Sequence, residues 1–199
     1  MQNGISNVRN KYICNTAVTW NQVYERDYAA KLDSPDQQAR NHLISGIIAD
    51  VAELHPSILD VGCGVGTVYR LIQHHDVDYK GIDISQIAIA HCDRDFGTQK
   101  GRNFEVAEFE NFESKSAFEV IVFNEVLYYF RLSQVRPVIK KAVSLLRGRN
   151  SLLVISMSNN PKAQVIWFLC RFLRKPLQSI SVRSKQGNSW TVKSYAPLA

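Results

Sequence analysis

Residues 57–72 read Ser57-Ile-Leu-Asp-Val-Gly-Cys-Gly-Val-Gly-Thr-Val-Tyr-Arg-Leu-Ile72. The apolar start predicts a short strand, and Gly62, Gly64 and Gly66 follow it at alternate positions. A helix is expected next, because apolar residues recur on one face. Glycines let the backbone turn tightly and let a ligand approach main-chain N–H groups without a Cβ clash. A helix N-terminus adds unpaired N–H groups and partial positive charge. The stretch therefore predicts a ligand-binding loop between a strand and a helix.

A second strand is expected at 79–83, which reads Tyr79-Lys-Gly-Ile-Asp83 and ends in an acid. Asp83 lies 21 positions after Gly62, where a nucleotide-binding unit places the carboxylate that accepts the ribose hydroxyls. A dinucleotide fingerprint, G-x-G-x-x-G, would put its third glycine at position 67, which is Thr67. The spacing therefore argues against a pyrophosphate site.

The string from Leu59 to Gly66, with Asp60 inside it and the acid-ended strand after it, resembles the first two motifs of the class I S-adenosylmethionine-dependent methyltransferases. The resemblance implies that the cofactor is S-adenosylmethionine, that the product is S-adenosylhomocysteine and that the reaction is methyl transfer. The alternative interpretation is a tight turn between a strand and a helix in an unrelated α/β protein.

The resemblance extends from about Trp20 to Tyr195 and looks closest to small bacterial methyltransferases with an Asn-Glu-Val-Leu-Tyr-Tyr signature after the fourth strand, here 124–129. Trp167 and Trp190 match two tryptophans in the C-terminal part of that group. The chain departs from the group at 147–150, where Arg-Gly-Arg-Asn replaces a common Pro-Gly-Gly. That departure changes a turn and adds charge without touching the cofactor motifs.

Strands and helices alternate along most of the chain. Further strands are expected at 102–107, 118–123 and 151–156, with helices at about 19–32, 35–54, 85–97, 132–146 and 161–173. Pro137 should lie in the first turn of its helix or shift the helix start. This alternation predicts a doubly wound parallel sheet.

The last part of the chain predicts an antiparallel hairpin, with strands at 177–184 and 189–195 around Gly187-Asn188. A parallel sheet that ends in such a hairpin looks like the seven-stranded, three-layer, Rossmann-like methyltransferase fold. We expect residues 1–18 to be a flexible lead and 19–199 to be a single methyltransferase domain. Within it, 19–55 would form an N-terminal helical lid and 56–199 the sheet core.

Composition narrows the class of protein. The 199 residues are 45% hydrophobic, which is enough for a core, and no apolar run is long enough to span a membrane. The N-terminus lacks a signal-peptide pattern. Four widely spaced cysteines without a C-x-x-C pair predict free thiols in a reducing, cytoplasmic setting. The five histidines form no convincing metal site, so no metal is expected.

Charge is divided unevenly. All 18 acids lie in residues 1–125, whereas 126–199 holds 13 Lys and Arg and no acid. This division predicts either a basic surface that attracts an anionic partner or simply a solvated face balanced by the acidic half. If an anionic acceptor binds there, charge reversal at Arg147 and Arg149 should weaken acceptor binding without affecting the cofactor.

The ends of the strands supply the candidate site residues, because ligands bind there in an open α/β sheet. By resemblance, Asp60 helps hold the loop and the cofactor amino group, although it can also be a capping acid only. The three loop glycines approach the methionine part, Asp83 accepts both ribose hydroxyls or caps a helix, and Ile84 packs on the adenine. After the third strand, Glu108 would meet the adenine amino group. Phe109 is the alternative, as a stacking partner.

Asn124 and Glu125 end the fourth strand and should face the reacting centre. Methyl transfer depends mainly on alignment, and Glu125 is the best-placed base if the acceptor must lose a proton. Tyr128 and Tyr129 would line the acceptor pocket or pack in the core. The motif lacks the two prolines of Asn/Asp-Pro-Pro-Tyr, which marks methylation of planar amide or nucleobase amines. Such amines are therefore less favoured as methyl acceptors.

For two of the expected helices, at about 19–32 and 161–173, the sequence allows either a functional role or simple packing on the sheet. Trp20 and Tyr24 resemble a lid over the methionine moiety, with Tyr24 in the substrate pocket, or they pack on the sheet. Within the helix near 161–173, residues 165–170 are apolar on all sides and are flanked by basic residues. The helix either covers the sheet or contacts anionic lipid at a membrane surface.

The sequence therefore predicts a methyltransferase for a small and possibly anionic acceptor. One alternative is an RNA methyltransferase that uses the basic half, although no RNA-binding appendage accompanies it. Another is a protein that binds S-adenosylmethionine without catalysis. The oligomeric state is left open.

Overall fold

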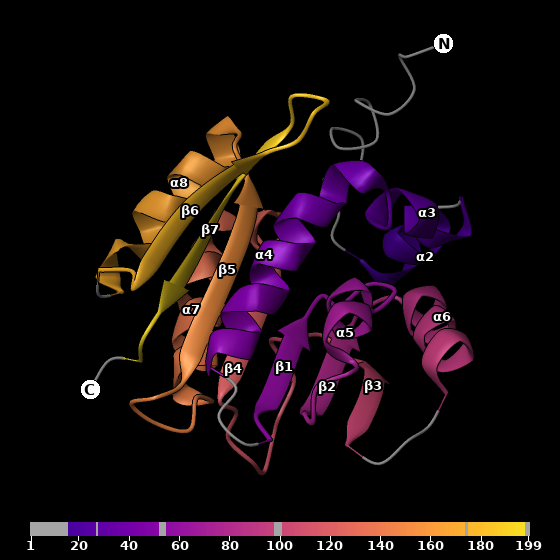
Figure 1. Cartoon of the computed structure of the whole chain (residues 1–199), viewed down its shortest axis with the longest axis horizontal. Helices are drawn as coiled ribbons and strands as arrows, with labels where there is room; N and C mark the ends of the chain where they lie inside the picture. Colours follow the sequence, from indigo (N-terminus) through magenta and orange to yellow (C-terminus); the bar gives the residue numbers. More distant parts are fainter. Residues whose placement is uncertain (1–15, 27, 52–54, 98–100, 174, 198–199) are drawn as a thin grey trace.

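The computed structural model of the chain describes residues 16–26, 28–51, 55–97, 101–173 and 175–197. These residues form one seven-stranded sheet in the order β3-β2-β1-β4-β5-β7-β6. The first five strands are parallel, and β7 runs antiparallel to both β5 and β6. The predicted fold is confirmed, including the C-terminal hairpin (Figure 1). The strands are β1 (Ser57–Val61), β2 (Asp78–Asp83), β3 (Arg102–Val106), β4 (Val120–Asn124), β5 (Leu152–Ser158), β6 (Gln178–Arg183) and β7 (Ser189–Tyr195).

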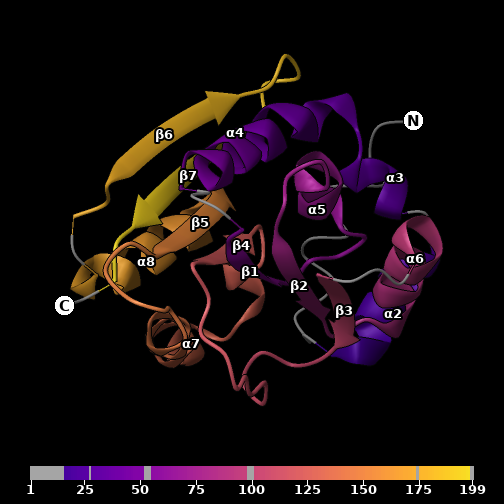
Figure 2. The same cartoon turned by 60° about the horizontal axis from the view of Figure 1, so that its bottom comes forward.

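Helices cover both faces of the sheet, which gives three layers (Figure 2). α4 and α5 pack on one face, and α7 and α8 pack on the other. α2 lies against α6 beyond the sheet. The helices are α2 (Ala17–Glu25), α3 (Tyr28–Leu32), α4 (Pro35–Val51), α5 (Thr67–Ile72), α6 (Gln86–Phe96), α7 (Leu132–Ser144) and α8 (Pro161–Leu169), with short 3₁₀ turns η1 (Leu127–Tyr129) and η2 (Cys170–Phe172).

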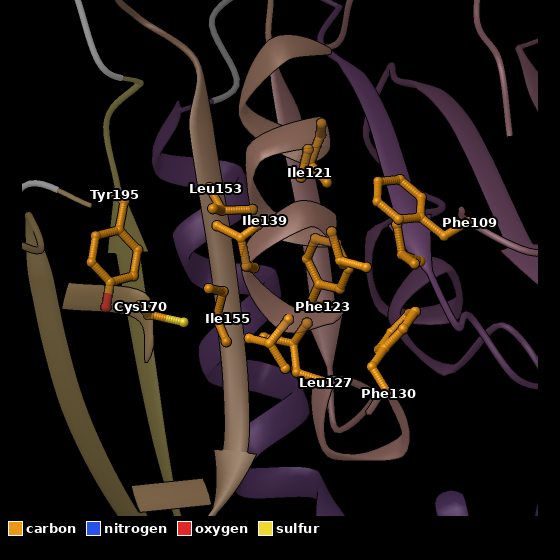
Figure 3. Close-up of a cluster of buried hydrophobic side chains, with 14 of the residues drawn as sticks. Phe109, Ile121, Phe123, Leu127, Phe130, Ile139, Leu153, Ile155, Cys170 and Tyr195 are labelled. Carbon is orange, nitrogen blue, oxygen red and sulfur yellow. The ribbon is translucent and has the colours of Figure 1, made fainter. Parts of the chain in front are cut away.

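β4 shows why the central strands are nearly continuous apolar runs. Successive side chains in a strand point to opposite faces, so Val120 and Val122 pack under α4 and α5. Ile121 and Phe123 pack in the other cluster, under α7 (Figure 3). All four side chains are fully buried. A parallel sheet with both faces covered requires this pattern, and it holds the strand ends in fixed positions.

The N-terminal helices differ from the sequence expectation in their limits. The side chain of Thr16 caps α2 by accepting a hydrogen bond from the Thr19 N–H at 3.2 Å. The helical region therefore begins inside the segment that was expected to be a flexible lead, and residues 1–15 lie outside the described part of the chain. α4 begins at Pro35 as predicted, because proline is favoured in the first helical turn.

Two helix predictions were wrong in detail. α7 begins at Leu132, so Pro137 lies in its second turn rather than its first. The turn tolerates it because Pro137 and Ser133, whose carbonyl loses its helical partner, are both exposed to water. The helix expected at 161–173 ends at Leu169 and continues only as η2.

Backbone hydrogen bonds join the carboxyl ends of the strands. The N–H groups of Gly62 and Cys63 both donate to the carbonyl of Ile82, at 2.8 and 3.0 Å. The N–H of Glu125 donates to the carbonyl of Ser156 at 2.9 Å. The segments that follow β1, β2, β4 and β5 are therefore fixed to one another at one edge of the sheet.

Candidate functional site

A cavity of about 490 Å³ lies at this edge, beyond the ends of β1, β2 and β4. Side chains of α2, α3 and α4 form its remaining walls. The strand order changes direction between β1 and β4, which is where an open parallel sheet binds ligands. The volume falls within the usual range for small-molecule sites. Of the predicted site residues, the wall contains Tyr24, Asp60, Gly62, Gly64, Asp83, Ile84, Glu108, Phe109, Asn124, Glu125 and Tyr129.

The glycine loop needs glycine for both conformation and space. Gly62 and Gly64 have φ values of +70° and +56°, which other residues adopt only with strain. A Cβ added to Gly62 would lie 2.5 Å from the side chain of Val126, and one added to Gly64 would lie 2.7 Å from the Tyr24 hydroxyl. Glycine at these two positions therefore lets Val126 and Tyr24, which also line the cavity, pack directly on the backbone of the loop.

Gly66 does not line the cavity, contrary to the prediction. Its φ is also positive, but a Cβ there would point toward α6, 2.6 Å from Phe96 and 3.3 Å from the Cys92 sulfur. The glycine allows α6 to pack close to the loop. A requirement for glycine at this position is thus one of helix packing rather than ligand contact.

Asp83 fixes the loop from the end of β2. Its Oδ2 accepts a hydrogen bond from the Gly64 N–H at 3.0 Å, and its Oδ1 accepts one from the Ser85 N–H at 2.8 Å. The side chain is buried. Burial raises the pKa of Asp83 to about 6, against the lowering effect of the hydrogen bonds from Ser85 and Gly64. Each oxygen keeps a lone pair for a ligand in the cavity.

Asp60 is buried below the loop and also borders the cavity. Its Oδ2 accepts a hydrogen bond from the Tyr79 hydroxyl at 2.7 Å. Its Oδ1 has no partner among the described residues. Burial raises the pKa of Asp60 to about 7, although the Tyr79 hydrogen bond opposes this. An unpaired buried carboxylate oxygen is costly, so a ligand that donates a hydrogen bond or carries positive charge would satisfy it.

The segment after β3 places both predicted residues at the cavity. Glu108 is exposed, and its Oε2 accepts a hydrogen bond from Asn111 at 2.9 Å. Phe109 is buried and packs edge-on against Phe123 at a ring separation of 5.4 Å. Phe109 is therefore part of the core as well as the wall, and Glu108 is the polar group at this point.

Glu125 follows β4 in an unusual backbone conformation, with φ of +63°. Strain of this kind in a residue other than glycine is often found at functional sites. Its Oε2 accepts hydrogen bonds from the Tyr128 hydroxyl at 2.6 Å and from the Trp190 indole N–H at 3.2 Å. Its Oε1 is buried and has no partner among the described residues. Tyr128 is thus directed at Glu125 and packs against the hydrophobic core rather than lining the cavity, which is the second of its two predicted positions.

Arg40 of α4 is the main residue that sequence reasoning missed. It is only 2% exposed and lines the cavity. Its Nη1 lies 3.6 Å from Glu125 Oε2, and its guanidinium lies 5.3 Å from the Trp190 ring centre. The sequence did contain a signal that Arg40 is buried. Arg40 lies four and eight positions before the buried Ile44 and Ile48, and this spacing places all three on the same face of the helix.

Further hydrogen bonds hold this buried cation. Arg40 donates to Gln37 Oε1 at 2.6 Å and, through Nη2, to Asn41 Oδ1 at 3.0 Å. Asn41 Oδ1 also accepts from the side-chain amide of Asn124 at 3.3 Å. Asn124 therefore presents its amide nitrogen to α4, and its Oδ1 has no partner among the described residues.

The N-terminal helices supply an aromatic wall. Trp20 packs edge-on against Tyr129 at a ring separation of 4.6 Å, and Tyr24 packs edge-on against Tyr28 at 5.7 Å. The side chain of Asn21 ties α2 to the start of α6, because its Oδ1 accepts a hydrogen bond from the Ser85 hydroxyl at 2.8 Å. Trp20 and Tyr24, the two residues that resemble a lid, therefore line the cavity together with Tyr129.

Arg147 lies at the opposite edge of the sheet. Its N–H donates to the carbonyl of Phe118, ahead of β4, and its side chain pairs with Glu119. Arg149 precedes β5 and is exposed. Charge reversal at these two positions is therefore not expected to change acceptor binding in the cavity, which corrects the sequence-based prediction.

The described residues contain no cluster of three or more side chains suited to a metal ion. They also contain no helix that is both long and apolar enough to cross a membrane. Cys63, Cys92 and Cys170 are free thiols, as the sequence predicted, while Cys14 lies outside the described residues.

Residues 59–151 match a family model described as a methyltransferase domain. None of the curated proteins matches the sequence significantly.

Solved structures share the fold over most of the chain. The N-methyltransferase NodS from Bradyrhizobium japonicum, in complex with S-adenosylhomocysteine, has a TM-score of 0.76 and 17% identity, over 90% of this chain and 98% of NodS. The magnesium protoporphyrin IX methyltransferase from Synechocystis, with bound S-adenosylhomocysteine, has a TM-score of 0.61 and 15% identity, over 81% of this chain and 83% of that one.

A [4+2]-cyclase, SpnF, also shares the fold, with a TM-score of 0.67 and 15% identity over 82% of this chain and 84% of the cyclase. The fold alone therefore does not define the reaction. Two findings stand together. Residues 59–151 match a methyltransferase domain, and the chain has the fold of the S-adenosylmethionine-dependent methyltransferases.

Proposed function

We propose that the protein is an S-adenosylmethionine-dependent methyltransferase that acts on a small molecule through an N–H or O–H group. The observation that carries the proposal is Asp83, whose buried carboxylate is hydrogen-bonded to the Gly64 backbone at the floor of a 490 Å³ cavity. This arrangement supports a nucleoside with free ribose hydroxyls above a loop of bare backbone.

The cavity residues fit the parts of this cofactor. Asp83 has lone pairs for the ribose hydroxyls, and Asp60 Oδ1 lacks a partner that a cofactor ammonium group would supply. Ile84 and Phe109 offer apolar surface for the adenine, and exposed Glu108 can accept from its amino group. Gly62 and Gly64 allow close approach of the methionine part. The bound cofactor would supply an electrophilic methyl group.

The acceptor is proposed to bind on the side of the cavity formed by Asn124, Glu125 and the aromatic wall. Glu125 Oε2 already accepts from Tyr128 and Trp190, so Oε1 is the oxygen that can take a proton. Asn124 Oδ1 adds a second unpartnered acceptor. Two such oxygens call for a ligand with hydrogen-bond donors, which an amine or hydroxyl provides.

The main argument for an anionic acceptor no longer holds, because Arg147 and Arg149 lie at the edge of the sheet opposite the cavity. The charged side chains on the cavity wall are mostly acidic, with Asp60, Asp83, Glu108, Glu110 and Glu125 against Arg40 and Arg131. This balance favours a neutral or cationic acceptor. Among the described residues, no feature specifically favours an RNA acceptor, or a role in which the protein binds S-adenosylmethionine without catalysing a reaction.

Calorimetric titration with S-adenosylmethionine and, separately, with NAD tests the proposed cofactor. We expect binding of the first with a Kd on the order of micromolar and no binding of the second, because the third glycine is not positioned for a pyrophosphate. Release of S-adenosylhomocysteine in the presence of a panel of small amines and alcohols then tests the acceptor class. Binding of NAD alone, or turnover only with carboxylates and phosphates, would contradict the proposal.

Cofactor affinity should depend on pH through Asp83. Its pKa is raised to about 6, so the carboxylate is ionised at about pH 7 and largely protonated at about pH 5. The protonated form loses acceptor capacity for the ribose hydroxyls, so we expect binding to be about tenfold weaker at about pH 5 than at about pH 7. Titrations across this range check the expectation, and the Asp83→Asn variant should show a flatter profile.

A further inference from the structure

α8 carries apolar side chains that the rest of the described chain does not cover. Ala163 and Ile166 are buried against α7 and the sheet, whereas Val165 and Phe168 are 44% and 64% exposed. The two exposed residues are three positions apart and therefore share one face of the helix. Leu177, shortly before β6, is 63% exposed. A helix that is apolar on all sides is normally covered, so the outward face of α8 indicates a missing partner.

Basic side chains lie beside α8 and η2. The Arg171 guanidinium lies 5.6 Å from the centre of the exposed Phe168 ring. On neighbouring elements, Arg136 lies 5.3 Å from the Phe172 ring and the Lys193 ammonium lies 4.2 Å from the Trp167 ring. Lys175 is exposed. The segments that form this surface all belong to residues 126–199, which contain 13 Lys and Arg and no acid.

We propose that Val165, Phe168, Arg171, Lys175 and Leu177, here called the α8 surface, bind the surface of an anionic phospholipid bilayer. Phe168, Val165 and Leu177 would enter the boundary between headgroups and acyl chains, and the cations would lie at the level of the lipid phosphates. Long basic side chains suit this arrangement, because their apolar stems cover hydrocarbon while their charges stay in water.

The same features argue against other partners. A second copy of the chain would bring one positive surface against another, which opposes association. RNA is recognised by stacking of bases on aromatic side chains, and Val165 and Leu177 cannot provide that contact. An anionic bilayer matches both the aliphatic centre and the basic surroundings.

The start of α8 lies near the edge of the sheet that holds the cavity. Lys162, in the first turn of α8, donates a hydrogen bond to the backbone carbonyl of Tyr128 at 2.5 Å. The next residue, Tyr129, is on the cavity wall. Leu177, by contrast, donates its N–H to the Ser194 carbonyl, which lies toward the start of β5. Lipid binding does not require methyl transfer, so the two proposals succeed or fail separately.

Co-sedimentation of the full chain with vesicles tests the proposal. The vesicles are phosphatidylcholine alone, or phosphatidylcholine with about a third phosphatidylglycerol. We expect recovery with the anionic vesicles only, reduced by added salt. The double variant Val165→Ser/Phe168→Ser should lower the partition coefficient about tenfold, and Arg171→Glu should lower it by a similar factor.

Matched controls test whether vesicle binding depends on the α8 surface or on any exposed basic or apolar side chain. Arg94→Glu makes the same charge change at an exposed position on α6, at the β3 end of the sheet and far from β6 in the strand order. Val18→Ser removes an apolar side chain that is 67% exposed on α2. Both should bind vesicles as the wild type does, and thermal melting should show that every variant is folded. Equal recovery with neutral and anionic vesicles, or equal losses for Arg94→Glu and Arg171→Glu, would overturn the proposal. So would a dimer or a complex with RNA that the Val165→Ser/Phe168→Ser change disrupts while vesicle binding is unaffected.

Discussion

Replacing Asp83 by alanine is expected to weaken S-adenosylmethionine binding by at least about a hundredfold. The change removes the acceptor for both ribose hydroxyls, and hydrogen bonds to a charged group contribute about 1.5–3 kcal/mol each. It also leaves the N–H groups of Gly64 and Ser85 without their present acceptor, so the loop loses part of its fixed geometry. Calorimetric titration measures the loss directly.

Asp78 provides a control on the same strand. Its side chain is 57% exposed at the start of β2, on the far side from the cavity, where it pairs with His55. Asp78→Ala should therefore bind the cofactor as the wild type does. Asp83→Asn, which keeps one carbonyl oxygen, should fall between the wild type and Asp83→Ala. Wild-type affinity in Asp83→Ala would show that the ribose binds elsewhere.

Replacing Arg40 by methionine is expected to lower the free energy of unfolding by about 3–5 kcal/mol, because removal of one partner leaves the other charge buried and uncompensated. Glu125 would keep only Tyr128 and Trp190, and the side-chain oxygen of Gln37 would lose its Arg40 donor. Asn41 Oδ1 would keep only the Asn124 amide. The Arg40 Nη1–Glu125 Oε2 separation of 3.6 Å is too long for a hydrogen bond. The interaction between Arg40 and Glu125 is therefore electrostatic, without a direct hydrogen bond.

A double-mutant cycle isolates that coupling. Denaturant unfolding of Arg40→Met, Glu125→Gln and the combined variant should show a double loss smaller than the sum of the single losses. Arg40→Lys keeps the charge but lacks the planar fork that reaches Gln37 and Asn41 together, so its loss should be intermediate. Strict additivity of the two single changes would show that the two side chains do not interact.

The fold and the placement of the glycine loop beside Asp83 were largely predictable, because local features determine them. The apolar strand at 57–61 with its alternating glycines, and the acid at the end of 79–83, lie close together in sequence. The sheet connects them through contacts that parallel pairing dictates. β7 matches the predicted strand at 189–195 residue for residue. Here periodicity and turn residues carry the necessary information.

The acceptor end depends on contacts between distant residues. Asn41 and Asn124 are 83 positions apart, and Glu125 and Trp190 are 65 positions apart. The helical spacing of Arg40 shows which face of α4 it occupies, but spacing does not identify the side chain across from it. Tyr128 illustrates the same limit, because its direction depends on the left-handed backbone of Glu125. No local pattern encodes that conformation.

The position of β7 also has a consequence for biosynthesis. β7 lies between β5 and β6, and it supplies Trp190, which donates to Glu125. A nascent chain that has emerged only as far as β5 would already have the glycine loop, Asp83 and Glu125, yet Glu125 would lack one of its donors and β5 would have an unpaired edge. Because domains generally fold as units during synthesis, we expect stable folding of the sheet to wait until the C-terminal hairpin has emerged. The acceptor end would be completed only after residues 189–195 are released.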